Sequence, residues 1–253
     1  LGTSKSIMMV ILLRVPQGIG GAMVFGTSVA ILSSVFPAKE RGSVLGLNVA
    51  AVYAGLSFGP FLGGLLTQQF GWRSVFFLNV PLGLFTIWFS IWKLRGEWAE
   101  GWSKPFDSIG SFIYCAMLLS LMYGFSLLPR VAGAFFVMLG ICGIPVFVHW
   151  EGKVTNPVLD ISLFRSNRVF TLSNIASLIN YSATFAVGFL LSFYLQNIKG
   201  LSPQNAGIIL VSQPIVQALL SPMAGRLSDR IEPRIVASSG MGLTAIGLFV
   251  FAF

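Results

Sequence analysis

Apolar stretches, each long enough to cross a lipid bilayer, recur along the whole chain and leave little sequence for anything else. A membrane-spanning helix needs about 20 residues, and eight such stretches fit into the 253 residues. Only 9% of the residues are charged, whereas a soluble domain carries about 25%. Because lipid cannot satisfy open backbone polar groups, each stretch must form a helix. The sequence therefore predicts an all-α polytopic membrane protein without a sizeable soluble domain.

The expected spans are separated by short polar segments, with two longer ones at 93–107 and 151–168. The predicted spans are Ile7–Leu32, Ser43–Leu66, Val75–Trp92, Ser108–Leu128, Val131–Trp150, Phe170–Leu195, Ala206–Gly225 and an eighth that starts near Ile235. In the second polar segment, residues 157–164 (PVLDISLF) alternate apolar and polar side chains. This alternation is typical of a stretch on the membrane surface, and a simple connecting turn is the alternative. The chain begins with Leu inside apolar sequence, so we expect an internal piece of a longer protein.

The basic residues are distributed unequally between the two alternate sets of loops. One alternate set of loops holds eleven Lys and Arg residues, while the other set holds four. The positive-inside rule places the richer set in the cytoplasm. The net charge of +8 is thereby explained by topology, and no nucleic-acid partner is expected.

Small residues form a regular pattern in the second predicted span. Gly55, Gly59 and Gly63 are spaced at i, i+4 and i+8, so they lie on one face of a helix. In a bilayer, such a bare face lets another helix approach closely. An ordinary packing face without a role in transport is the alternative interpretation.

Arg14 is a charge well inside the first predicted span. Together with Gln17, Gly18 and Gly21 it lies on one helical face. A charge at this depth costs about 2.5–3.5 kcal/mol on insertion scales, which indicates a function unless the side chain snorkels to the outer headgroups. Arginine does not deprotonate. Its role would be to tune the pKa of a nearby carboxylate, or to bind that carboxylate in one state of a cycle.

Several spaced motifs together resemble those of the major facilitator drug:proton antiporters. The antiporter motif of the fifth span in that family is matched by Gly46, Gly55, Gly59, Pro60, Gly63 and Gly64. Arg14 and Gln17 take the places of the fourth-span motif, where the arginine is linked to proton transfer. The start of the sixth span is similar to Trp72, Arg73, Phe76, Phe77, Asn79, Pro81 and Gly83.

A fourth motif, GRLSDRIEPR at 225–234, resembles the cytoplasmic gating loop of the family. Gly225, Asp229, Arg230 and Arg234 fit the pattern, while Glu232 and Pro233 stand where glycine and a basic residue are usual. We expect Asp229 to pair with Arg226 or Arg230 as a conformational latch. A charged loop that only sets topology is the alternative.

Five predicted spans separate the antiporter motif from the loop motif, two more than in a twelve-span facilitator. The resemblance therefore implies the fourteen-span branch, with this chain covering spans four to eleven of a partial major facilitator fold. Residues 1–95 would end the N-terminal helix bundle, 96–168 would hold two extra linker spans, and 169–253 would begin the C-terminal bundle.

The function implied by the resemblance is proton-coupled export of drugs or other amphipathic small molecules by alternating access. Its partners would be the substrate, protons and the bilayer, in a monomeric multi-pass protein of the cell membrane without a cofactor or metal. Polar residues that could face a substrate cavity are Asn174, Asn180, Tyr181, Gln213 and Gln217. Asn and Gln in spans also bond helices to one another, so that role stays open.

Other functions remain as alternatives. The exporter could serve one natural product or siderophore, or the chain could be a membrane scaffold that transports nothing. An intramembrane enzyme needs titratable groups gathered within the membrane. His149 lies at a span end, and all eight acidic residues lie in or beside loops, which disfavours an enzyme. Cys115 and Cys142 show no metal or disulfide spacing.

Overall fold

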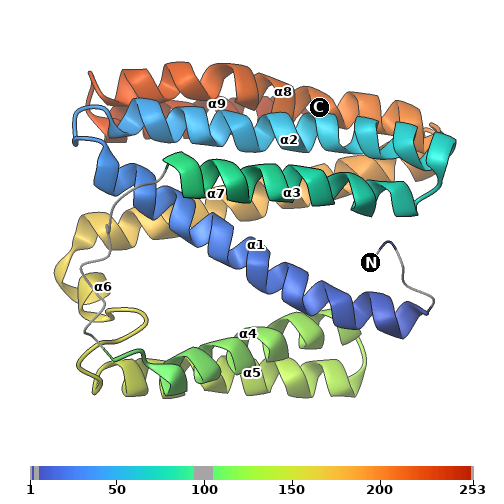
Figure 1. Ribbon diagram of the computed structural model, residues 1–253. Helices are drawn as coiled ribbons and strands as arrows, with labels where there is room; N and C mark the ends of the chain where they lie inside the picture. The colour runs from blue at the N-terminus through green and yellow to red at the C-terminus, as the bar shows by residue number, and fades with distance from the viewer. Residues whose placement is uncertain (1, 3–5, 94–104, 252–253) are drawn as a thin grey trace. The chain divides into compact units, whose positions relative to one another are not determined.

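The computed structural model describes residue 2 and residues 6–93 and 105–251, except the side chain of Pro203, and this part contains helices without strands (Figure 1). The elements are α1 (Ile7–Val35), α2 (Arg41–Phe70), α3 (Arg73–Lys93), α4 (Ser108–Leu127), α5 (Val131–Glu151), α6 (Ser162–Ser166), α7 (Arg168–Phe193), the π-helix η1 (Tyr194–Ile198), α8 (Pro203–Ser228) and α9 (Pro233–Phe251).

Eight helices in the described ranges are long and apolar enough to cross a membrane. The predicted eight spans and the all-α class are thereby confirmed. The sixth span continues through η1 as far as Ile198, three residues beyond the predicted end. The alternating segment 157–164 runs into the short helix α6, where we had expected a surface stretch or turn.

Side-chain caps explain where several helices begin. Ser6 accepts a hydrogen bond from the backbone N–H of Met9 at 3.2 Å at the start of α1. Asp107 does the same at the start of α4, and Ser202 at the start of α8. Such caps satisfy backbone donors that have no partner within the helix. The start of α2 differs, because Glu40 makes no side-chain cap.

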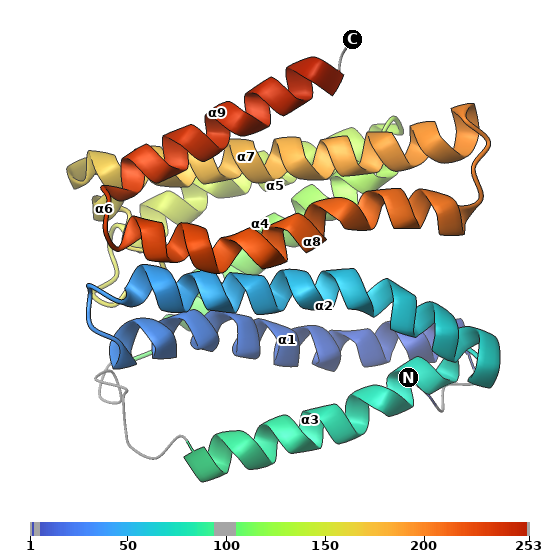
Figure 2. The same cartoon turned by 90° about the horizontal axis from the view of Figure 1, so that it is seen from above.

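One compact unit comprises residues 1–98 and 186–253. Its centre is the pair α2 and α8, which pack along each other, while α1 and α3 contact α2, and α9 and η1 contact α8. Figures 1 and 2 show α2 and α8 side by side. This unit holds helices from both predicted bundles. The expected boundary at 95–96 lies outside the described residues.

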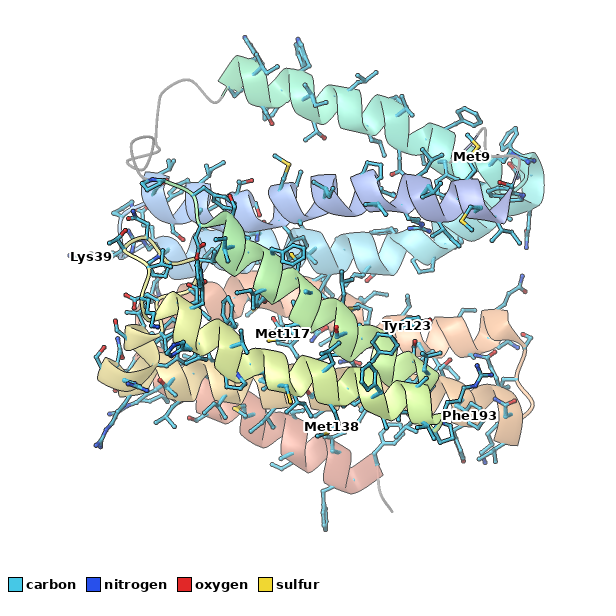
Figure 3. The ribbon with its side chains drawn as sticks, turned by 90° about the horizontal axis from the view of Figure 1, so that it is seen from below. Met9, Lys39, Met117, Tyr123, Met138 and Phe193 are labelled. Atoms are coloured by element: carbon cyan, nitrogen blue, oxygen red, sulfur yellow. The ribbon has the colours of Figure 1, made fainter. Side chains whose placement is uncertain are left out.

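The second compact unit comprises residues 99–185 and is centred on the hairpin of α4 and α5. A short connection with a cis Leu128–Pro129 peptide joins the two helices. Side chains of α4, among them Met117 and Tyr123, line the hairpin (Figure 3). Tyr123 meets Phe136 edge to face, with ring centroids 5.1 Å apart. Glycines make this pairing close, since a Cβ at Gly124 would lie 2.6 Å from the backbone N of Val137.

Candidate functional site

The α2–α8 crossing is built from glycine on both helices. A Cβ added at Gly46 would lie 2.6 Å from the carbonyl oxygen of Ser221 and 3.0 Å from the Cα of Gly225. A Cβ added at Gly225 would overlap the carbonyl oxygen of Gly42. These contacts are backbone to backbone, so no side-chain movement could make room. The helices can approach this closely only because these positions carry no side chain.

The carboxylate of Asp229 closes one end of this crossing. It follows α8 directly, and its two oxygens accept hydrogen bonds from the backbone N–H groups of Gly42 and Ser43, each at 2.7 Å. Gly42 and Ser43 are the second and third residues of α2, which are the donors that an N-cap side chain normally satisfies. We call Gly42, Ser43, Gly46, Gly225 and Asp229 the clasp.

Electrostatics favour this arrangement. The N-terminus of α2 carries the positive end of the helix dipole, which attracts a carboxylate. Glu40 leaves the donors of α2 free, so Asp229, from α8's end, acts as the missing cap. The bonds are part-buried, which strengthens them relative to bonds in water.

The ion pair predicted between Asp229 and Arg226 or Arg230 is not formed in the described part of this structure, and the latch stays a prediction. Within the described ranges, neither arginine forms an ion pair with Asp229, and the ion pair found nearby joins Arg234 to Glu232 at 2.8 Å. Two backbone N–H groups fix both oxygens of a carboxylate at a helix terminus. An arginine pair at this exposed loop would gain little, because water screens it.

Gly42 and Ser43 were missed by the sequence reasoning. Gly42 precedes Gly46 by four residues, so these two glycines share one helical face, and this spacing could have identified Gly42 as a packing position. Nothing in the local sequence indicates that Ser43 offers its backbone N–H to a residue 186 positions away.

The glycine stripe formed by Gly55, Gly59 and Gly63 is open in this structure, as is the neighbouring Gly64. A Cβ at Gly55, Gly59, Gly63 or Gly64 would meet no atom within 4 Å in the part of the chain that the structure describes. Pro60 lies inside α2, which continues through it to Phe70. The close helix contact that we expected at Gly55, Gly59 and Gly63 is therefore not formed by the described residues, and it stays a prediction. The close contact of α2 lies instead at Gly46, outside the stripe.

Arg14 is exposed on α1, as is Gln17. The arginine guanidinium lies 6.0 Å from the ring centroid of Phe76 on α3, at the outer limit of a cation–π contact. Phe76 belongs to the sixth-span motif noted in the sequence, so two of the motifs meet here. No carboxylate forms an ion pair with Arg14 in residues 6–93 or 105–251.

The residues proposed for a substrate cavity fall into two groups. Asn174 on α7 donates to the carbonyl oxygen of Phe170 at 2.9 Å within its own helix, and Asn180 and Tyr181 belong to the same unit. Gln213 and Gln217 lie on α8 in the other unit.

Known proteins match this chain over most of its length. The family model of the Major Facilitator Superfamily matches residues 1–150 and 173–253. The riboflavin transporter RibZ of Clostridioides difficile is 31% identical over 248 residues, which cover 97% of this chain and 53% of RibZ. The multidrug resistance protein Stp of Mycobacterium tuberculosis is 30% identical, covering 100% of this chain and 48% of Stp.

A third relative is the tetracenomycin C resistance and export protein of Streptomyces glaucescens, 30% identical over 98% of this chain and 47% of the relative. The chain thus spans about half the length of these relatives. With eight apolar spans and a family match over most of its length, this multi-pass integral membrane protein belongs to the Major Facilitator Superfamily.

Proposed function

We propose that the full-length protein exports amphipathic small molecules across the cell membrane, driven by inward proton flow, as a member of the fourteen-span branch of its superfamily. The observation that carries the proposal is the clasp, in which the carboxylate of Asp229 caps the N-terminus of α2 at the Gly46–Gly225 crossing. A contact of this kind can hold one end of a transport pathway closed and still be released.

The physics of the clasp suits a gate. Its two hydrogen bonds join Asp229 to Gly42 and Ser43, which lie far from it in the chain. Neither α2 nor α8 depends on these bonds for its own helical hydrogen bonding. When α2 and α8 separate at this end, water can take over both partners. The net cost is then about 1 kcal/mol for each bond. A substrate or proton can shift an equilibrium of that size by binding one state more tightly.

Proton coupling is assigned to Arg14, with Gln17 beside it. The described carboxylates lie at or beyond helix ends, so we propose that the acidic partner of Arg14 belongs to the remainder of the full-length protein. The open stripe of Gly55, Gly59 and Gly63 would receive a helix from the same remainder and seal the bundle interface against proton leak. The two groups of polar residues on α7 and α8 would contact the substrate.

The names of the relatives support transport, one of them names export, and together they leave the range of substrates open. One is a multidrug resistance protein, while others are named for riboflavin or for tetracenomycin C. Export of one specific compound is therefore the second candidate. Parallel efflux assays with a panel of unrelated amphipathic cations distinguish the two, because a specific exporter moves none of them.

The decisive experiment measures efflux of a fluorescent cation from vesicles containing the full-length protein under an imposed pH gradient. Arg14→Ala is expected to abolish proton-driven export, since the coupling carboxylate loses the charge that tunes it. Arg14→Lys keeps part of it, because the ammonium lacks the planar fork of arginine. Arg130→Ala, which removes an exposed arginine from the α4–α5 turn, is the matched control and keeps the wild-type rate.

Two outcomes would contradict the proposal. Wild-type export by Arg14→Ala would show that the arginine only snorkels to the membrane surface. A wild-type protein that produces no substrate-dependent proton flux with any compound would favour a membrane scaffold.

A further inference from the structure

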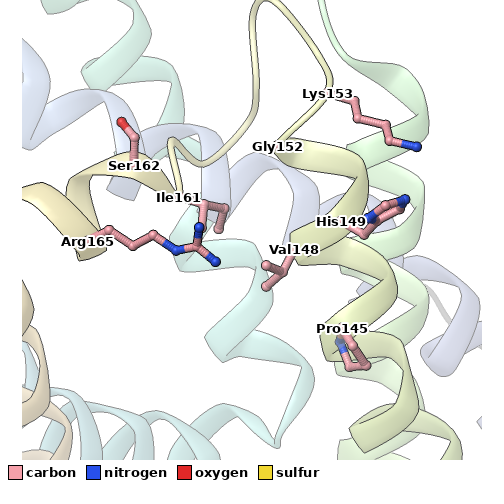
Figure 4. A pocket seen from close by; sticks show the side chains of 8 residues that line it. All are labelled: Pro145, Val148, His149, Gly152, Lys153, Ile161, Ser162 and Arg165. Carbon is pink, nitrogen blue, oxygen red and sulfur yellow. The ribbon is translucent and has the colours of Figure 1, made fainter.

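A hollow of about 510 Å³ lies between the C-terminal end of α5 and the short helix α6, within the second compact unit. Arg165 on α6 and His149 and Lys153 at the end of α5 line this hollow. Figure 4 shows Arg165 reaching from α6 toward α5, while the side chains of His149 and Lys153 point away from Arg165. All three side chains are exposed. The hollow therefore has a rim of basic groups that come from two separate helical segments.

The nearby carboxylates form no ion pair with this rim in the described ranges. Glu151 is only 3% exposed, and its Oε2 accepts a hydrogen bond from the backbone N–H of Leu159. Asp160 uses Oδ1 to accept from the backbone N–H of Ser162. No ion pair involves His149, Lys153 or Arg165 in the described ranges. The rim thus offers two permanent positive charges and one histidine to an incoming anion.

The lining below the rim is apolar. Pro145, Val148 and Ile161 face the hollow (Figure 4). A second hollow of about 380 Å³ shares Pro145, His149 and Lys153 and is otherwise lined by Ile113, Val146 and Trp150. Basic groups therefore stand above two adjoining apolar surfaces, at the end of a helix that is apolar enough to span the membrane.

We propose that this basic-rimmed hollow is a binding site for one anionic phospholipid, with the headgroup among the rim residues His149, Lys153 and Arg165 and the acyl chains along the apolar linings. Basic pockets at the cytoplasmic ends of membrane helices favour such headgroups, and the positive-inside pattern places the α5–α6 end on that side. A free phosphate would use the rim alone and leave the apolar surfaces uncovered.

The site lies in the segment that connects the hairpin to α7. A lipid held by α5 and α6 together would tie residues 152–167 to the membrane surface. This role is independent of substrate transport, so it stands or falls separately from the proposed export.

The test is lipid binding to the purified full-length protein, measured by native mass spectrometry with phosphatidylglycerol and with phosphatidylcholine of the same acyl chains. Each basic residue near an anionic lipid contributes about 1 kcal/mol, which is about fivefold in affinity. Lys153→Gln/Arg165→Gln is therefore expected to weaken phosphatidylglycerol binding about thirtyfold. Lys39→Gln/Arg226→Gln removes the same charge from other loops and leaves binding unchanged.

Two further measurements distinguish binding of a phospholipid from binding of a simple anion. Ile161→Ser should weaken phosphatidylglycerol binding while inorganic phosphate fails to displace the lipid. The proposal is overturned if the double variant binds phosphatidylglycerol as the wild type does, if phosphatidylcholine binds equally well, or if inorganic phosphate displaces the lipid. Thermal unfolding of each variant without added lipid confirms that it is folded.

Discussion

The α2–α8 crossing and the α4–α5 hairpin use the same two devices in different ways. Both bring glycines into backbone contact, and both place a carboxylate on a helix N-terminus. In the hairpin, Asp107 caps its own helix by accepting from the N–H of Gly110, three residues away, at 2.8 Å. At the crossing, Asp229 caps a helix that begins almost 190 residues earlier in the chain.

The cap of α4 should persist when the neighbouring helices move, whereas the cap of α2 should be lost when α2 and α8 separate. A cap supplied by the preceding residue stays with its helix, whatever the neighbouring helices do. Trp150 adds to it by donating to Asp107 across the hairpin at 3.1 Å. A cap supplied by another helix exists only while the two helices are together. We infer that the hairpin is a rigid pair and that the crossing is the element that can open.

The largest expected effect comes from filling the glycine contacts. In the full-length protein, Gly46→Leu should abolish export and lower the free energy of unfolding by about 3 kcal/mol, because its side chain meets the backbone of α8. Gly124→Leu should destabilise the hairpin similarly, yet leave the export rate per folded molecule near wild type. Thermal unfolding and vesicle efflux measure the two effects.

Gly26→Leu is the control for this comparison, because a Cβ at Gly26 meets no described atom within 4 Å. Wild-type stability in Gly46→Leu would show that the α2–α8 contact is not formed in the membrane. Loss of export in folded Gly124→Leu would give the hairpin a direct part in transport.

A smaller effect should follow from neutralising each cap. Asp229→Asn removes the charge at the N-terminus of α2, worth up to about 1 kcal/mol, so the crossing should open more often. Labelling of Ser43→Cys by an impermeant maleimide should then become about fivefold faster. Asp107→Asn, the matched change in the hairpin, should leave this labelling rate unaltered. Equal acceleration by both substitutions would remove the distinction between the two caps.

The smallest expected effect concerns Glu151 at the base of the hairpin. Its Oε1 is buried without a hydrogen-bond partner, and a Cβ at Gly110 would overlap both this oxygen and Oδ2 of Asp107. Glu151→Gln should therefore stabilise the protein by about 0.5 to 1 kcal/mol, because the amide can donate toward Asp107. Glu151→Ala, which loses the bond to Leu159, should be destabilising. Thermal unfolding compares the two, and destabilisation by glutamine would contradict the assignment.

The local sequence was sufficient to predict the helices and insufficient to predict which helices pack together. Length and hydropathy predicted eight spans because each helix satisfies its own backbone within lipid. Gly46 and Gly225 were identified as motif residues, but their mutual contact was not predicted. The spacing of residues along one helix does not indicate which other helix packs against it. The same limit applies to Asp229, for which we expected a neighbouring arginine, whereas in this structure its carboxylate accepts from the distant backbone N–H groups of Gly42 and Ser43.

The sequence by itself determined that this chain is a series of membrane helices, which of their faces are bare, and that a charge lies within the first of them. These properties follow from side-chain chemistry and helical period, which are local. Only the tertiary structure decided that Asp229 caps α2, that Gly46 meets α8, and that basic groups from α5 and α6 share one hollow. Each of these depends on which backbone atoms are left unsatisfied or close together once the helices pack, because no residue carries that information alone.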